Sequence, residues 1–197
     1  YERNGGSVRK SNHTVTLENE IVYPYIKTDD INDGEIIEAK RYCIFPYQFG
    51  HRQPYDLNIV RTKYPCFYSF FMKPEIQRAI NTSSSYNSRI QNNSVDYGIF
   101  RVGEYTWSDW FLATRDNTKS SFAIVGKIKT HWGECKQPLF DGHINYLSRE
   151  NEKPLTEERA RQLFYIFKQE GVKLYIKYAA DARSISSRLY NDIKIDN

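Results

Sequence analysis

The sequence has little cysteine and no long apolar run, and both absences narrow what the chain can be. Its three cysteines, Cys43, Cys66 and Cys135, are odd in number and far apart, and no Cys-x-x-Cys pair occurs. This pattern suits neither a zinc site nor a redox dithiol, so we expect a reduced, cytoplasmic setting. No apolar stretch reaches the roughly 18 residues of a membrane-spanning helix, so we expect no membrane partner.

Several catalytic signatures are also missing. There is no Gly-rich phosphate loop, no Ser-His-Asp order and no Cys-His nucleophile pair. The sequence begins at Tyr1 rather than at Met and has no apolar signal segment, so we expect a fragment of a longer protein.

What is abundant is aromatic side chains. The 197 residues include 16 Tyr, 11 Phe and 3 Trp, and 40% of the chain is hydrophobic, which is enough for one compact domain or two small lobes. Basic residues exceed acidic ones by 28 to 24, and this small excess says little about partners. Aromatic rings supply stacking surfaces for bases as well as core, so they are the more informative feature.

The spacing of apolar residues predicts an α+β fold, with a mixed or antiparallel sheet and peripheral helices. A helix is expected over residues 64–80, and a second from an N-cap at Thr156 to Gly171, with Ala160, Leu163, Phe164 and Phe167 on one face. Strand character recurs in short β-branched or aromatic runs, which are residues 21–26, 42–47, 97–111, 122–129, 174–178 and 192–195.

Two acidic groupings offer metal chemistry. Glu38-Ala39-Lys40 follows Asp29, Asp30 and Asp33, and acids beside a lysine could hold a metal ion and activate water as in a nuclease. Such triplets also arise by composition, so a nuclease site is the lesser alternative. A second set could supply zinc ligands within thirteen residues, but its spacing matches no closed zinc site and favours a solvated loop; its members are His131, Glu134, Cys135, Asp141 and His143.

Basic and aromatic residues alternate in expected turns, a pattern typical of nucleic-acid surfaces. Arg and Lys contact phosphates or guanine edges, and Tyr and Trp stack or wedge. For any one of them taken alone, a solvated surface charge or a core ring is the favoured interpretation. The candidate DNA-binding residues are Arg101, Tyr105, Trp107, Arg115, Lys119, Lys127, Lys129, Arg183 and Arg188.

Residues 97–111 read Tyr-Gly-Ile-Phe-Arg-Val-Gly-Glu-Tyr-Thr-Trp-Ser-Asp-Trp-Phe. This string resembles the C-terminal specificity regions of Type II restriction–modification adenine methyltransferases, both the TaqI-like group and the fused Type IIG restriction–methylation enzymes. Gly103, Tyr105, Thr106 and Trp107 match the family's Gly-x-Tyr-Thr-aromatic turn. Similar segments follow the family's order on both sides, and they are residues 23–31, 44–47, 140–148, the helix expected from Thr156, and residues 184–188 and 193–195.

The resemblance implies a target recognition domain over residues 15–197, after a flexible leading segment at residues 1–14. It implies double-stranded DNA as one partner and the catalytic methyltransferase domain of the same parent chain as another. The family's catalytic Asn-Pro-Pro-Tyr and Gly-rich cofactor motifs are absent from this sequence. We therefore expect no catalytic residue and no cofactor in this chain, with S-adenosylmethionine bound in the missing catalytic domain.

Two alternatives stay open from the sequence. The chain could belong to a bifunctional restriction endonuclease–methyltransferase, which would add Mg²⁺ as a cofactor of the parent protein. It could instead be a single-stranded nucleic-acid or protein-interaction module, with its aromatic rings as a stacking platform.

Overall fold

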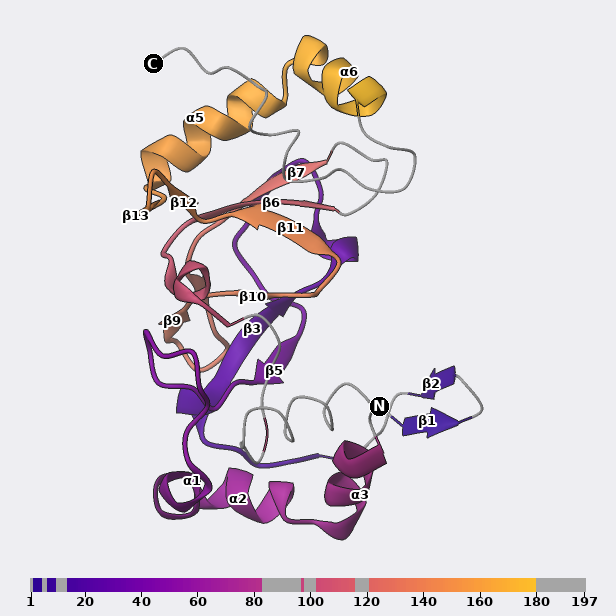
Figure 1. The fold of residues 1–197 in the computed structure, drawn as a ribbon, viewed down its shortest axis with the longest axis vertical. Coiled ribbons are helices and arrows are strands. Elements are labelled where there is room, and N and C mark those ends of the chain that lie inside the picture. Colours follow the sequence, from indigo (N-terminus) through magenta and orange to yellow (C-terminus); the bar gives the residue numbers. More distant parts are fainter. Residues whose placement is uncertain are drawn as a thin grey trace. The chain divides into compact units, whose positions relative to one another are not determined.

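The computed structural model describes residues 2–4, 7–9, 14–82, 97, 102–115 and 121–179, with side chains from residue 14 to residue 174. The chain divides into two compact units, which we describe separately. The helical unit comprises Tyr1–Ile21 and Tyr55–Gly98, and the sheet unit comprises Val22–Pro54 and Ile99–Asn197. Helices combine with parallel and antiparallel strand pairs, so the predicted α+β class is confirmed (Figure 1).

The described part of the helical unit contains three short helices and a small hairpin. The helices are α1 (Leu57–Lys63), α2 (Pro65–Phe71) and α3 (Pro74–Thr82), and the hairpin pairs β1 (Glu2–Asn4) with β2 (Ser7–Arg9). The predicted single helix over residues 64–80 is therefore wrong in its continuity. Proline lacks the N–H that a helix interior needs, so Pro65 and Pro74 each begin a new helix instead.

Aromatic side chains form the core of the helical unit. The ring of Tyr97 meets Phe67 and Phe71 edge-on, with ring centroids 5.8 and 5.1 Å away. Its hydroxyl donates a 2.6 Å hydrogen bond to the carbonyl of Tyr55. A short 3-10 helix, η1 (Asn19–Ile21), contributes the buried Ile21 to this unit.

The sheet unit is built around a four-stranded sheet in the order β11-β6-β7-β4. The central strands β6 and β7 are antiparallel, and so are β6 and β11, whereas β4 runs parallel to β7. The bounds are β4 Gly34–Ile36, β6 Phe111–Arg115, β7 Phe122–Val125 and β11 Ile144–Leu147.

A smaller three-stranded sheet has the order β10-β3-β5, with β3 antiparallel to β5 and parallel to β10. Two further strand pairs, β8 with β9 and β12 with β13, are antiparallel. The bounds are β3 Val22–Ile26, β5 Tyr42–Ile44, β8 Ile128–Lys129, β9 Cys135–Lys136, β10 Leu139–Phe140, β12 Arg149–Glu150 and β13 Lys153–Pro154.

Both faces of the four-stranded sheet are apolar, because alternate residues of β6 and β7 point to opposite sides. On one face Leu112, Phe122 and Ile124 join a core cluster with helix α5 (Glu157–Phe167). On the other face Phe111 and Val125 pack with residues that include Ile26 and Ile128. The central strands are therefore covered on both sides, which explains why β7 reads as a continuous apolar run.

The predicted C-terminal helix is confirmed, and the strand predicted after it is wrong. Thr156 accepts a hydrogen bond from the backbone N–H of Arg159 at the start of α5. Helix α5 ends at its C-cap Lys168, and a second helix, α6 (Glu170–Ala179), begins two residues later, so Gly171 lies inside a helix. Residues 174–178 are helical because Val172 packs against the α5 cluster, which overrides the alternating pattern. The strand predicted at 192–195 lies outside the described residues.

Candidate nucleic-acid interface

The strand predicted over residues 97–111 is wrong for residues 102–110, because β6 begins only at Phe111. A 3-10 helix, η3 (Glu104–Trp107), follows Gly103 and leads into β6. The backbone N–H of Thr106 donates to the carbonyl of Gly103 at 3.0 Å, and the Thr106 hydroxyl accepts from the Gly103 N–H at 3.2 Å. A Cβ at residue 103 would lie 2.5 Å from Cε1 of Tyr105, so any larger residue there would force the Tyr105 ring to move.

The turn exposes one aromatic side chain and buries the next. Tyr105 is 37% exposed, and its ring lies 6.2 Å from that of Tyr146. Burial raises the pKa of the Tyr146 hydroxyl above its ordinary value, and the nearby Tyr105 adds to the rise. The Tyr146 hydroxyl therefore stays protonated and neutral at physiological pH. Trp107 is only 8% exposed and supports the turn from below.

A second turn meets the same tryptophan. The N–H of His51 donates to the carbonyl of Gln48 at 3.0 Å, and Gly50 has a φ of 80°, as a type II β-turn requires at its third residue. Phe49 therefore stands at the second position of this turn. Its ring lies 5.2 Å from that of Trp107 and yet is 60% exposed.

The base of the Phe49 turn is fixed by stacked rings. Phe45 stacks on Tyr47 at 4.3 Å and contacts Trp107 at 5.5 Å, and all three rings belong to one buried cluster. A bridge between Tyr47 and Pro54 closes the loop. The exposed Phe49 is thus held on a rigid support.

Charged side chains surround the two turns. Glu104 pairs with Arg52 at 3.7 Å and with Arg149 at 3.1 Å. The side chains of Arg52 and Glu104 are 68% and 60% exposed, so both are accessible to a ligand. We call the group formed by Phe49, Arg52, Glu104, Tyr105 and Arg149 the aromatic turn surface.

Of the other predicted residues, Lys127 lies at the same end of the β6–β7 pair as the η3 turn. It pairs with Asp109 at 2.9 Å. Lys129 is exposed on β8. Arg115 ends β6 at the opposite end, about 13 Å away along the strand from Phe111. Its Nε is buried without a hydrogen-bond partner among the described residues.

The structure therefore does not bring all the predicted residues together. Tyr105 belongs to the aromatic turn surface, and Trp107 is buried beneath that surface. Arg115 lies at the opposite end of β6 and is not part of the surface. Four further predicted residues lie outside the described residues, and they are Arg101, Lys119, Arg183 and Arg188.

Sequence reasoning missed Phe49, Arg52 and Arg149. The signal for the first was the Gly50 that follows it, because Phe-Gly at the centre of a turn places an apolar ring at its tip. No local signal marks the approach of the Phe49 turn to Trp107, because the two residues are far apart in the chain and meet only on folding.

Three acidic residues of the nuclease alternative, Asp29, Asp30 and Asp33, are engaged in ion pairs. Asp30 is buried and binds Arg41 at 2.6 Å and Lys40 at 3.1 Å. Burial raises the pKa of Asp29, but the hydrogen bond and charge of Arg41 outweigh it, so the net shift is downward. Among the described residues, no three His, Cys, Asp or Glu side chains gather where they could hold a metal ion.

The residues weighed as zinc ligands stabilise turns. Glu134 accepts a 2.9 Å hydrogen bond from the indole N–H of Trp132. Asp141 accepts from the hydroxyl of Tyr25 and from the N–H of His143, each at 3.0 Å. The expected turn at Trp132–Gly133 is present, but the expected loop after it is wrong in part, because Cys135 lies in strand β9 and Asp141 directly follows strand β10.

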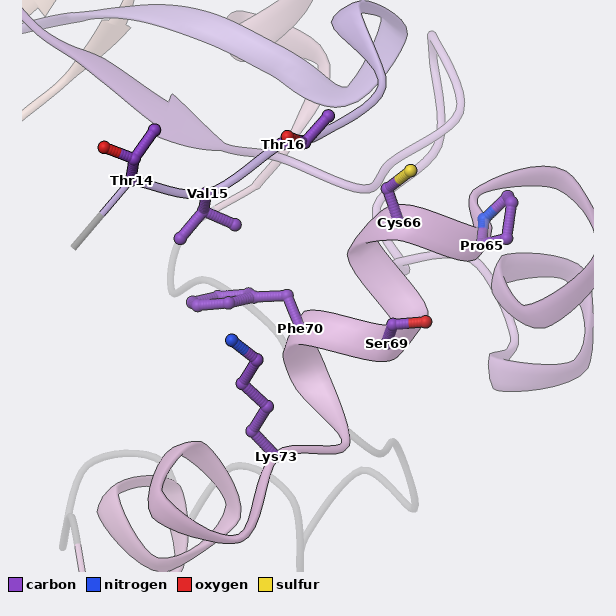
Figure 2. Close-up of a pocket in the computed structure, with 8 residues that line it drawn as sticks. All are labelled: Thr14, Val15, Thr16, Pro65, Cys66, Ser69, Phe70 and Lys73. Atoms are coloured by element: carbon purple, nitrogen blue, oxygen red, sulfur yellow. The ribbon is translucent and has the colours of Figure 1, made fainter.

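The helical unit carries a separate shallow pocket of about 410 Å³. Figure 2 shows Phe70 and Lys73 on one side and the extended Thr14–Thr16 segment on the other. Beside it, the Glu18 carboxylate accepts from the backbone N–H of Cys66 at 2.6 Å and of Phe67 at 3.0 Å, which satisfies the start of α2. The polar groups of the pocket form no catalytic arrangement that we recognise.

Comparison with known proteins finds similarity to a methyltransferase. No family model matches the chain. The chain is similar to a Type II methyltransferase. This relative, M.NspV from a Nostoc species, is 27% identical over 140 residues, which is 71% of this chain and 26% of the relative. The chain thus spans about a quarter of the length of this methyltransferase.

No helix in the described part of the chain is long and apolar enough to cross a membrane.

Proposed function

We propose that this chain recognises a specific sequence in double-stranded DNA on behalf of an adenine-specific methyltransferase of a restriction–modification system. One observation carries the proposal. The similarity to a Type II methyltransferase covers most of this chain but only about a quarter of the relative. The chain itself contains no Asn-Pro-Pro-Tyr motif. A part that is shared with a methyltransferase but lacks the motif for methyl transfer to adenine is best explained as a recognition part.

The division of labour has a physical reason. An enzyme that modifies a base must take that base out of the helical stack, at a cost of a few kcal/mol. A second surface must meanwhile hold and read the surrounding duplex, through phosphate contacts that fix position and groove contacts that specify sequence. In this account, S-adenosylmethionine binds to a catalytic domain in the parent protein and not to this chain.

The aromatic turn surface supports the proposal because it supplies both kinds of contact. Arg52 and Arg149 are cations that can contact phosphates or guanine edges. Phe49 and Tyr105 are exposed rings on two neighbouring turns of the sheet unit. Lys127 and Lys129 add exposed positive charge on the segment that follows β7.

The test is a selection from a library of random duplexes. The purified chain is incubated with the library, and the retained DNA is amplified and sequenced over several rounds. Enrichment of one short motif supports sequence recognition. Retention of the library without enrichment, or stronger retention of the same DNA as single strands, contradicts it. The second result would favour a single-stranded nucleic-acid module.

A further inference from the structure

The side chain of Phe49 is unusually exposed to solvent for a phenylalanine. Fully burying a phenylalanine side chain stabilises a protein substantially, yet this ring stays 60% exposed while its neighbours Phe45 and Tyr47 are almost completely buried. A single exposed apolar residue needs no explanation by itself. The position of Phe49 does need an explanation, because Phe49 lies at the tip of a turn whose backbone is fixed by the hydrogen bond from the His51 N–H to the Gln48 carbonyl.

The support beneath the ring is rigid. Trp107, Phe45 and Tyr47 form a buried aromatic cluster, and Phe49 touches it through Trp107. A ring that is already fixed in place loses little conformational entropy when it makes a contact. Phe49 is therefore a preorganised apolar projection.

The charges beside the projection fit a polyanion. Arg52 follows Phe49 by three residues in the chain, and its ion pair with Glu104 is long, at 3.7 Å, and exposed. Exposed ion pairs of this kind contribute little to stability, so a phosphate can replace the carboxylate at small cost. Arg149 reaches the same carboxylate from β12.

We propose that Phe49 inserts at a base step of duplex DNA as a wedge, while Arg52 exchanges Glu104 for an adjacent phosphate. Apolar side chains that enter base steps partly unstack them and bend the duplex, and the bend brings more protein into contact. This inference rests on the proposed function and adds the residue that deforms the DNA.

The experiment uses the full chain and the duplex obtained from the selection. A series of duplexes carries 2-aminopurine at each adenine in turn, because the fluorescence of this base rises when it is unstacked. Binding is followed in parallel by anisotropy. The variants are Phe49→Ala, Phe49→Leu as an apolar replacement, and Tyr165→Ala as the control. Tyr165 is a 69% exposed aromatic residue on α5.

We expect the wild-type chain to raise the fluorescence at one step of the duplex. Phe49→Ala should remove this rise and weaken binding about tenfold, as the loss of one aromatic contact with a base does. Phe49→Leu should retain part of the rise, and Tyr165→Ala should behave as the wild type. Thermal melting of each variant checks that the fold is intact, and the leucine variant serves if the alanine variant unfolds.

The outcomes separate this inference from the proposed function. If the wild-type chain binds no duplex, the proposed function fails and the wedge fails with it. If the wild type binds with sequence preference and Phe49→Ala has the same fluorescence and affinity, only the wedge is overturned. If the wild-type chain binds the duplex without raising the fluorescence at any step, and Phe49→Ala still loses affinity, the wedge is also overturned, because Phe49 would then touch the DNA without entering the stack.

Discussion

Arg52→Ala is the most informative single substitution on the aromatic turn surface. The side chain is 68% exposed, and its ion pair with Glu104 is 3.7 Å long. Exposed pairs contribute about 0 to 1 kcal/mol, so the variant should unfold at nearly the same temperature as the wild type. Any change in DNA binding can then be assigned to the lost cation rather than to a damaged fold.

The size of the change follows from counterion release. Each phosphate neutralised by a protein cation adds about 0.9 to the slope of log K against log salt concentration, so Arg52→Ala should reduce the slope by about 0.9. Between about 50 and about 200 mM salt, the affinity of the variant should therefore fall about 3.5-fold less than that of the wild type. The loss should be similar on selected and scrambled duplexes, because a phosphate contact carries no sequence information.

The assay is fluorescence anisotropy on both duplexes across a salt series, with Lys168→Ala as the matched control. Lys168 is an exposed lysine at the end of α5, outside the aromatic turn surface. The Lys168→Ala variant should leave the slope of log K against log salt concentration unchanged. If Arg52→Ala gives the wild-type slope and affinity, Arg52 makes no phosphate contact and the surface is misplaced. If Lys168→Ala lowers the slope equally, the binding is diffuse and not local to this surface.

Four further predictions test other parts of the account. The chain incubated with labelled S-adenosylmethionine and mixed-sequence duplex should incorporate no methyl group into adenine, and specific incorporation would refute a recognition-only chain. Plasmid DNA with Mg²⁺ or Mn²⁺ should stay intact; cleavage that Glu38→Ala abolishes in a folded variant would establish the nuclease alternative. A thiol reagent at neutral pH should label the exposed Cys135 much faster than the partly buried Cys43, because burial raises the pKa of the Cys43 thiol to about 12, and mass spectrometry of the labelled peptides would show the order. The hydrogen bonds from Arg159 lower the pKa of Glu150, so Glu150→Gln should cost less than about 1 kcal/mol at neutral pH, and denaturant titrations should show the difference shrinking below about pH 4; a constant difference would mean that the carboxylate charge is not involved.

Elements with a local cause could be predicted from the sequence. Thr156 followed by two acidic residues begins α5, and Leu163, Phe164 and Phe167 form its buried face, as their spacing indicates. Local pattern fails where tertiary contacts decide. The alternation in residues 174–178 indicates a strand, yet the segment is the helix α6, whose Val172 packs on the α5 cluster.

The candidate site could be predicted only in part, for the same reason. The Gly103–Trp107 turn carries its own signal, because Gly103 leaves room for Tyr105. Which of the two rings would be exposed depends on Phe45, which packs on Trp107 from a distant segment. Arg52 and Arg149 meet at Glu104 from opposite halves of the chain, and no spacing within one segment predicts that meeting.

Competition between three DNAs tests the central claim most directly. A labelled duplex obtained from the selection is bound to the wild-type chain at one salt concentration. It is then displaced with the unlabelled selected duplex, a scrambled duplex and the selected sequence as a single strand. Specific protein–DNA complexes are typically at least 10³-fold tighter than nonspecific ones, so the account predicts that the selected duplex competes at the lowest concentration by a wide margin. Equal competition by all three DNAs would contradict sequence recognition, and stronger competition by the single strand would assign this chain to a different class of nucleic-acid binding.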